Sequence, residues 1–263
     1  MTNWREEQHP RDPKGRFREK GGGWAGTVAD QMSRGLWSGR VRAPRRHIDV
    51  TDMGPQTQQG LRDRFAPEDP MLAEIYRRQG FDGPPQVVSE PEMDDLVARG
   101  EVIEVWRGIE RHQHPDGSWS SARELAEQYR TGPYFAGQGV RGNGTYTTTD
   151  KNRATVGYSE AGGLLRIGIA ADARIADVRD VQDMAAEYSN ASEDFRRGWH
   201  QGDENIDTLL DRVTPEQIEA WILIDEGRLA AARGIDVIKI DRKGTGDVYI
   251  ILNRTATVVQ EAS

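Results

Sequence analysis

The sequence contains no cysteine among its 263 residues, so it can form neither a disulfide framework nor a thiolate metal site. No apolar run approaches the roughly 20 residues that a helix needs to cross a bilayer. Residues 1–20 are polar and charged, which is not the pattern of a secretory signal. No segment repeats within the chain. We therefore expect a soluble, cytoplasmic protein that makes no contact with a membrane.

Basic charge is scarce over most of the chain and concentrated at its N-terminal end. Residues 1–50 carry 11 Lys and Arg against 6 Asp and Glu, whereas the remaining residues carry 24 against 37. The same segment lacks hydrophobic periodicity and has three consecutive glycines at 21–23. We predict a basic, largely irregular arm over residues 1–55 that is not part of the core fold. It either contacts something anionic, such as nucleic acid or the acidic body, or is a solvated tail.

The rest of the chain divides into a helical part and a mixed part. Apolar residues recur at helical spacing between Met71 and Tyr76, and Pro91 is suited to open a second helix. Residues 56–100 are therefore predicted to be a helical lead-in. From residue 101 onward strands alternate with helices, and a glycine-rich hairpin closes the chain. This alternation predicts an α+β domain over residues 101–260.

Glycine is dense just before a strand that is rich in threonine. Gly137, Gly139 and Gly142 have the GxGxxG spacing of dinucleotide-binding folds, and Gly144 follows them. That fold needs a strand before the motif and a helix after it, whereas here a Thr-rich strand follows at once. We therefore reject a Rossmann fold. The glycines instead indicate a loop whose main chain lies close to a ligand or to a crossing strand.

Three short segments follow one another in an order that resembles the ADP-ribosyltransferase superfamily. They are Trp106-Arg107-Gly108 at the end of a strand, Thr145-Tyr146-Thr147 after the glycine loop with Tyr158 beyond, and Asp247-Val248-Tyr249 in the last hairpin. The second segment is similar to the glycine-x-glycine-x-tyrosine strand of poly-ADP-ribose polymerases. The arginine-glycine of the first segment is similar instead to the arginine-type toxin branch.

The resemblance covers roughly residues 100–260, and it points in particular to the ADP-ribosyltransferase-like domains of actinobacterial tailed phages. The matching segments are Gly142–Tyr146, Ala230–Asp236 and Tyr249–Arg254. The resemblance implies a split pair of β-sheets with flanking helices. It also implies an NAD-dependent, phage-encoded mono-ADP-ribosyltransferase that modifies a host protein or another host acceptor, in the bacterial cytoplasm or associated with the virion.

The resemblance also implies a role for individual residues. Cleavage of the bond between nicotinamide and ribose passes through an oxocarbenium-like state that a carboxylate stabilises. Arg107, Tyr146 and Asp247 are the expected catalytic residues. Arg107 would bind phosphate oxygens or ribose hydroxyls of the dinucleotide, and the rings of Tyr146 and Tyr158 would stack on the two faces of the nicotinamide. The expected NAD-binding residues are Arg107, Gly108, Gly144, Thr145, Tyr146, Thr147, Thr155 and Tyr158. His112 and His114 lie in a loop where solvent exposure is commoner than metal binding, so no metal is expected.

The chain departs from the superfamily in the third segment, where a glutamate is expected. No glutamate occurs between Glu226 and Glu261, so Asp247, one methylene shorter, is the nearest carboxylate. Glu160 and Glu204 are the alternatives. Two functions therefore remain open, which are the transferase and a non-catalytic phage structural or head-associated protein with a degenerate transferase fold.

Overall fold

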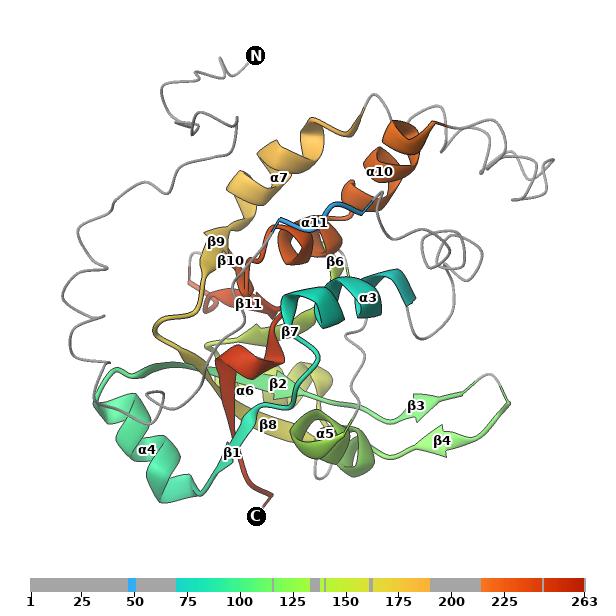
Figure 1. The fold of residues 1–263 in the computed structure, drawn as a ribbon. Helices are drawn as coiled ribbons and strands as arrows, with labels where there is room; N and C mark the ends of the chain where they lie inside the picture. Colours follow the sequence, from blue (N-terminus) through green and yellow to red (C-terminus); the bar gives the residue numbers. More distant parts are fainter. Residues whose placement is uncertain are drawn as a thin grey trace. The chain divides into compact units, whose positions relative to one another are not determined.

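The structure is a computed structural model that describes residues 47–50, 70–114, 116–132, 138–139, 141–160, 163–189, 214–242 and 244–262. All of these residues belong to one compact unit, which spans residues 42–263. The described part of the chain combines helices with one large sheet and two small ones (Figure 1). The predicted α+β class is therefore confirmed.

The large sheet has eight strands in the order β1-β12-β8-β2-β7-β11-β10-β9. Neighbouring strands run antiparallel, except that β1 pairs with β12 and β9 pairs with β10 in parallel. The strands are β1 Gln86–Val88, β2 Val102–Gly108, β7 Thr145–Thr148, β8 Leu164–Ala170, β9 Ile175–Asp177, β10 Val237–Ile240, β11 Val248–Ile251 and β12 Thr257–Gln260. The two small ladders pair β3 His112–Gln113 with β4 Trp119–Ser120 and β5 Gln138–Gly139 with β6 Gly142–Asn143.

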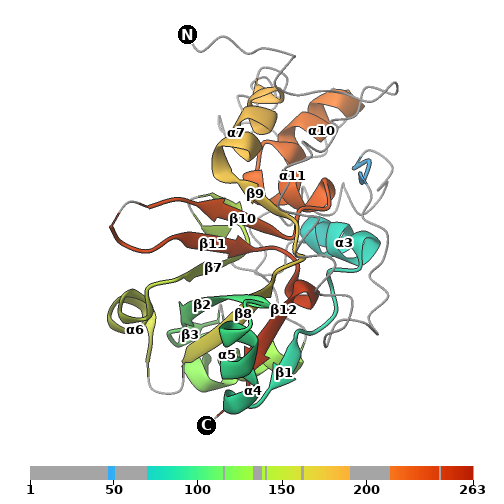
Figure 2. The same ribbon diagram turned by 90° about the vertical axis from the view of Figure 1, so that its left-hand side faces the viewer.

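The large sheet is nearly divided between β2 and β7. Strand β2 pairs with β8 along its whole length of seven residues, but it pairs with β7 only where Trp106 lies opposite Thr148. On its other side, β7 pairs with β11 over four residues. Figure 2 shows β7, β11 and β10 grouped apart from β2, β8 and β12. A single sheet therefore replaces the predicted pair of sheets, but its two halves meet at one residue pair.

Seven helices are present in the described ranges, and capping residues in the local sequence open several of them. Ser121 and Glu124 form a capping box at the start of α5, and Thr214 caps α10 with Pro215 as its first residue. None of these helices is long and apolar enough to cross a membrane. The helices are α3 Pro70–Gln79, α4 Glu90–Ala98, α5 Ala122–Thr131, α6 Lys151–Tyr158, α7 Val178–Ala186, α10 Pro215–Leu223 and α11 Glu226–Ala232.

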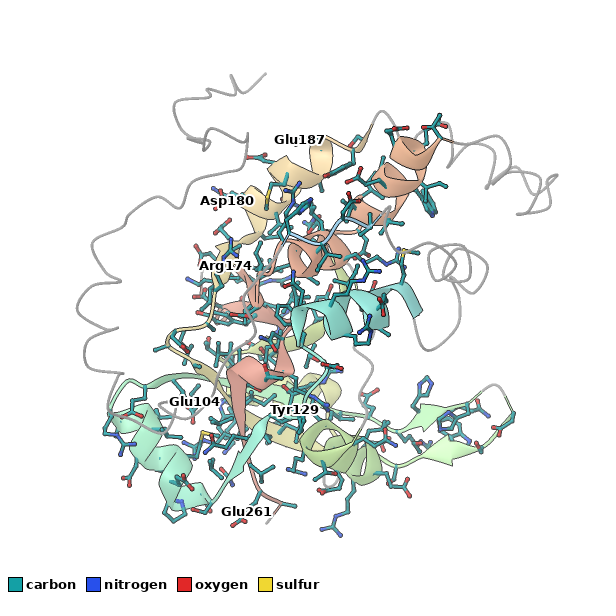
Figure 3. All side chains as sticks on the ribbon, in the orientation of Figure 1. Glu104, Tyr129, Arg174, Asp180, Glu187 and Glu261 are labelled. Atoms are coloured by element: carbon teal, nitrogen blue, oxygen red, sulfur yellow. The ribbon has the colours of Figure 1, made fainter. Side chains whose placement is uncertain are left out.

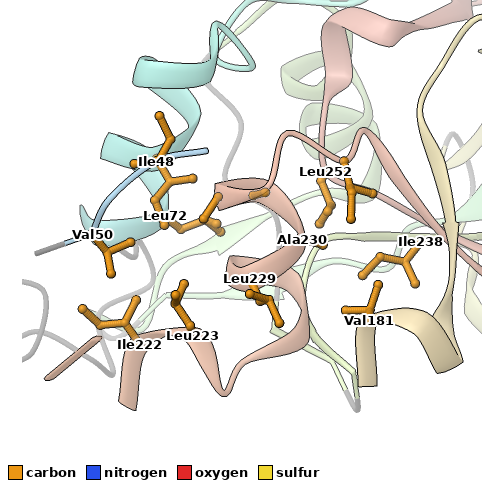
Figure 4. Packing of buried hydrophobic residues seen from close by; sticks show 14 of the residues in the cluster. Ile48, Val50, Leu72, Val181, Ile222, Leu223, Leu229, Ala230, Ile238 and Leu252 are labelled. Carbon is orange, nitrogen blue, oxygen red and sulfur yellow. The ribbon is translucent and has the colours of Figure 1, made fainter. Parts of the chain in front are cut away.

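Two hydrophobic cores are built from alternate residues of the same strands. Ile250 of β11 belongs to one core, together with residues of α3, α7, α10 and α11, and we call it the α11 core (Figure 4). Tyr249 and Ile251 belong to the other, together with Val105 of β2 and residues of α5, and we call it the α5 core. Successive side chains of a strand point to opposite faces, so β11 supplies both cores.

The segment 47–50 is irregular, but it belongs to the core, so the prediction for residues 1–55 is wrong at this point. Ile48 is 6% exposed and Val50 is fully buried, and both lie in the α11 core (Figure 4). The Ile48 amide donates a 2.8 Å hydrogen bond to the carbonyl of Ala232. Two apolar residues on either side of Asp49 are too short a pattern to predict burial. The remainder of the arm lies outside the described residues.

Arg254 ties the last turn of α5 to the 3₁₀-helix η3, Arg254–Ala256. Its guanidinium donates to the carbonyls of Gly83, Gln128, Tyr129 and Gly132 at 2.9–3.3 Å. The buried Tyr129 is labelled in Figure 3. A cation at this position stabilises the carbonyl end of a helix, where main-chain acceptors have no partner within the helix. This arginine therefore has a structural role.

Candidate functional site

The three segments singled out in the sequence lie on three consecutive strands of the sheet. Strand β2 ends in Arg107 and Gly108, β7 contains Tyr146, and β11 begins directly after Asp247. The order β2-β7-β11 makes these strands neighbours, although the chain between β2 and β11 contains five of the described helices and several other strands. The fold thus brings together residues that are about a hundred positions apart.

Arg107 lies where β2 and β7 separate. Its Nη1 donates a 3.0 Å hydrogen bond to the main-chain oxygen of Tyr146. Strands β2 and β7 are paired only at Trp106 and Thr148, so the Tyr146 carbonyl receives no main-chain hydrogen bond from β2. The guanidinium of Arg107 supplies the donor in its place. Its Nε is buried and has no hydrogen-bond partner in the described part of the chain. Among those residues Arg107 also has no carboxylate partner.

Arg166, on the neighbouring strand β8, shows what a paired arginine looks like in this sheet. Its guanidinium lies 2.6 Å from Asp94 and 2.6 Å from Glu104. It also lies 5.6 Å from the centroid of the Trp106 ring, on the face of β2 opposite to Arg107. The charge of Arg166 is therefore compensated within the protein, whereas Arg107 has no carboxylate partner among the residues that the structure describes.

The ring of Tyr146 does not lie where the resemblance implies. Its hydroxyl donates to the carbonyl of Gly142 at 3.0 Å and accepts from the amide of Arg141 at 2.8 Å. The ring packs against the α11 core, and this burial raises the pKa of the Tyr146 hydroxyl. By strand alternation Arg107 lies with Val105 on the face of the α5 core. Tyr146 therefore meets Arg107 through its carbonyl, and its ring is not placed to stack on a ligand held there.

The glycines of the loop serve packing against crossing elements, which is the second of the two predicted interpretations. A Cβ on Gly142, whose φ is 83°, would lie 2.5 Å from the carboxylate of Asp225. A Cβ on Gly144 would lie 2.2 Å from the side chain of Ile250. Both distances are too short for any other residue. At these two positions glycine is required by neighbouring protein atoms.

The predicted threonine hydroxyls are engaged within the protein. Thr145 is 2% exposed, and the hydroxyl of Thr147 donates to the carbonyl of Tyr249 at 2.8 Å. The hydroxyl of Thr155 donates to the carbonyl of Lys151 inside α6 at 2.8 Å. Tyr158 is the last residue of α6, and its side chain lies outside the described atoms. The threonines therefore position strands and a helix.

Asp247 lies on the far side of β7 from Arg107. Its carboxylate is 3.2 Å from the ammonium of Lys239 and accepts from the amide of Arg242 at 3.3 Å. The hydrogen bond from Lys239 is the main cause that lowers the pKa of Asp247. Asp247 is separated from Arg107 by two inter-strand spacings and by two residues along the strand direction. These spacings place the two main chains about 12 Å apart. A ligand of the size of a dinucleotide can span this distance.

The alternative carboxylates and the histidines contribute less to this site. Glu160 accepts from the amide of Arg111 at 3.2 Å and lies 3.6 Å from its guanidinium, so it is already paired. Glu204 lies outside the described residues. His112 and His114 lie in the β3–β4 hairpin with their ring centroids 5.5 Å apart. No group of three or more metal-binding side chains occurs among the residues that the structure describes.

Sequence reasoning missed Lys239, which faces Asp247 from the neighbouring strand. The signal was present in the sequence, because β10 and β11 form a hairpin in which Lys239 lies opposite Tyr249. Residues opposite each other in an antiparallel pair, and those two positions away, share a face. A register assigned to this hairpin would have placed the lysine beside the aspartate.

No family model matches the chain, and neither the curated proteins nor the solved structures contain a match to it.

Proposed function

We propose that this protein is an NAD-dependent mono-ADP-ribosyltransferase that holds the dinucleotide at Arg107. The observation that supports this function is the part-buried guanidinium of Arg107, with no carboxylate partner in the described ranges. A charge removed from water without a counter-ion is unfavourable, so a bound anion at this position would be stabilising. Arginine forms paired hydrogen bonds to phosphate oxygens, and NAD supplies two phosphates.

The neighbouring strands favour a dinucleotide over a simple anion. Arg107, at the end of β2, and Asp247, at the start of β11, lie on either side of β7 and on the same face of the sheet. NAD supplies ADP-ribose with nicotinamide as the leaving group. Arg107 would bind the phosphates, and the carboxylate of Asp247 would stabilise the positive charge that develops on the ribose. The ring of Tyr146 has no part in this scheme, because it packs in the α11 core.

The acceptor that we propose is a protein or another molecule of a bacterial host. This part of the proposal depends on the resemblance to phage domains, which also suggests that the protein is encoded by a phage. The enzyme would then act in the host cytoplasm or be carried with the virion.

A second function is favoured by the surroundings of Asp247. Its carboxylate is paired with Lys239, and the next position of β11 on the same face is occupied by the buried Tyr249 instead of a second carboxylate. Such a strand suits a module that binds a nucleotide without cleaving it. The alternative is therefore a non-catalytic, head-associated phage protein with a degenerate transferase fold.

The two functions differ in the release of nicotinamide. Purified protein would be incubated with NAD labelled in the nicotinamide ring, and release would be measured beside NAD affinity by calorimetry. A transferase releases nicotinamide, and Asp247→Asn should reduce that release about 100-fold, because one preorganised charge is worth a few kcal/mol, with affinity unchanged. Asp180→Asn, the same change at an exposed position of α7, is the matched control. Absence of release supports the alternative, and absence of NAD binding contradicts the transferase outright.

A further inference from the structure

We propose that Lys239 and Asp241 are positioning residues that set the charge and the orientation of the Asp247 carboxylate. The inference rests on the proposed function, because it assigns these two residues a part in the transfer of ADP-ribose. It concerns three side chains at the open end of the β10–β11 hairpin, which we call the hairpin triad: Lys239, Asp241 and Asp247.

One ammonium group in the hairpin triad serves two carboxylates. The Nζ of Lys239 lies 2.6 Å from Oδ1 of Asp241 and 3.2 Å from Oδ2 of Asp247. The other oxygen of Asp247 accepts from the amide of Arg242 at 3.3 Å. Both oxygens of Asp247 are therefore held, while the shorter contact of the lysine goes to Asp241. The triad carries a net charge of about −1 when all three groups are ionised.

The pairing of the hairpin produces this arrangement. Ile240 lies opposite Val248 and Lys239 lies opposite Tyr249, so Asp241 and Asp247 follow on the two strands at the next position. Lys239 and Asp241 are two residues apart and share one face, as do Tyr249 and Asp247. The lysine is therefore placed between the two carboxylates by the register of the strands.

The groups around Asp247 come from three elements. Thr149, which follows β7, accepts from the Asp247 amide through its hydroxyl at 3.0 Å. Asp150, the N-cap of α6, lies against the hairpin, because a Cβ on Gly246 would be 2.9 Å from its Cβ. Tyr249 lies two residues along β11. Of the charged side chains that face Asp247, only Lys239 is a cation with a contact to its carboxylate in the described ranges.

The geometry assigns a separate effect to each partner. Without Lys239, the Asp247 side chain would lose one of its two fixed contacts and would sample other rotamers. Without the charge of Asp241, the ammonium would pair with Asp247 alone and would offset the negative charge that the oxocarbenium needs. Both changes weaken stabilisation of the transition state, and neither touches the binding of NAD at Arg107.

The test compares nicotinamide release by the parent with that of Lys239→Met, Asp241→Asn and Lys239→Arg. We expect kcat to fall about tenfold in the first two variants with KM unchanged, the pattern for a loss felt only in the transition state. Lys239→Arg keeps the cation and should recover most of the rate. Arg99→Met is the matched control, because it removes a 2.7 Å ion pair with Glu101 of comparable exposure at the other end of β2.

A pH profile separates positioning from a purely structural effect. The hydrogen bond from Lys239 lowers the pKa of Asp247, so its loss should move the acid limb of kcat to higher pH in Lys239→Met. A merely structural role would lower the rate without moving that limb. Should the parent be active while Lys239→Met and Asp241→Asn match it, the inference is wrong and the proposed function stands. A parent that releases no nicotinamide contradicts the proposed function, and the inference with it.

Discussion

The guanidinium of Arg107 donates a 3.0 Å hydrogen bond to the main-chain oxygen of Tyr146, across the point where β2 and β7 separate. The contact uses one nitrogen of the arginine and leaves its charge without a carboxylate in the described part of the chain. The strand junction is thereby closed by a side chain whose Nε retains an unused N–H donor among the described residues.

Replacing Arg107 should affect ligand binding far more than folding. Arg107→Met should weaken NAD binding at least about tenfold, because it removes a charge-assisted contact worth about 1.5–3 kcal/mol. The free energy of unfolding should change by less than about 1 kcal/mol, because no carboxylate loses its partner. Calorimetry with NAD and urea unfolding measure the two effects.

Arg166→Met is the control for this prediction, because Arg166 is paired with Asp94 and Glu104. It should lower the free energy of unfolding by about 1–2 kcal/mol and leave NAD affinity unchanged. If Arg107→Met destabilises the protein as much as Arg166→Met and NAD binds equally well to both, Arg107 is a structural residue.

Gly227→Ala should destabilise the protein, although alanine is the better helix former. A Cβ at this position of α11 would lie 2.0 Å from the carbonyl oxygen of Asn143, so helix and loop must move apart. We expect a loss of about 1–3 kcal/mol in urea unfolding. Gly157→Ala in α6 is the matched control, because a Cβ there has nothing within 4 Å and should stabilise by about 0.5–1 kcal/mol. Equal gains in both variants would show that α11 does not press on the loop.

Arg254→Met should be among the most destabilising substitutions of a polar residue. It would leave the carbonyls of Gly83, Gln128, Tyr129 and Gly132 without the donor that they share. We expect a loss of about 3 kcal/mol or more, measured by urea unfolding. Arg242→Met, the same change at an exposed position, should stay within about 0.5 kcal/mol. Comparable losses in the two variants would contradict the role of Arg254 at the end of α5.

Ile48→Ala should lower the free energy of unfolding by about 2–4 kcal/mol, because the side chain is 6% exposed within the α11 core. Val87→Ala, at a position that is 43% exposed, should change it by about 0.5 kcal/mol or less. Thermal or urea unfolding followed by circular dichroism measures both. A loss no greater than that of the control would place residues 47–50 outside the core after all.

Local patterns in the sequence determined the class of the fold and many of its elements. A few consecutive residues specify each of these features: the capping boxes of α5 and α10, the proline that opens α10, and the hairpin of β10 and β11. Each depends on hydrogen bonds between neighbours or on the period of apolar side chains, so a short window contains the cause. The strand that ends in Arg107 and the one that contains Tyr146 were predicted in the same way.

Only the tertiary structure decided how these elements meet. The sequence predicted that Arg107 and Tyr146 share a site, but the sheet order and the single pair between β2 and β7 decided that the arginine meets a carbonyl and that the ring turns to the other core. Asp247 was singled out as a carboxylate, whereas its partner Lys239 follows from strand register. The crowding at Gly227 depends on atoms some eighty residues away. Such contacts arise when distant segments pack, and no local propensity specifies them.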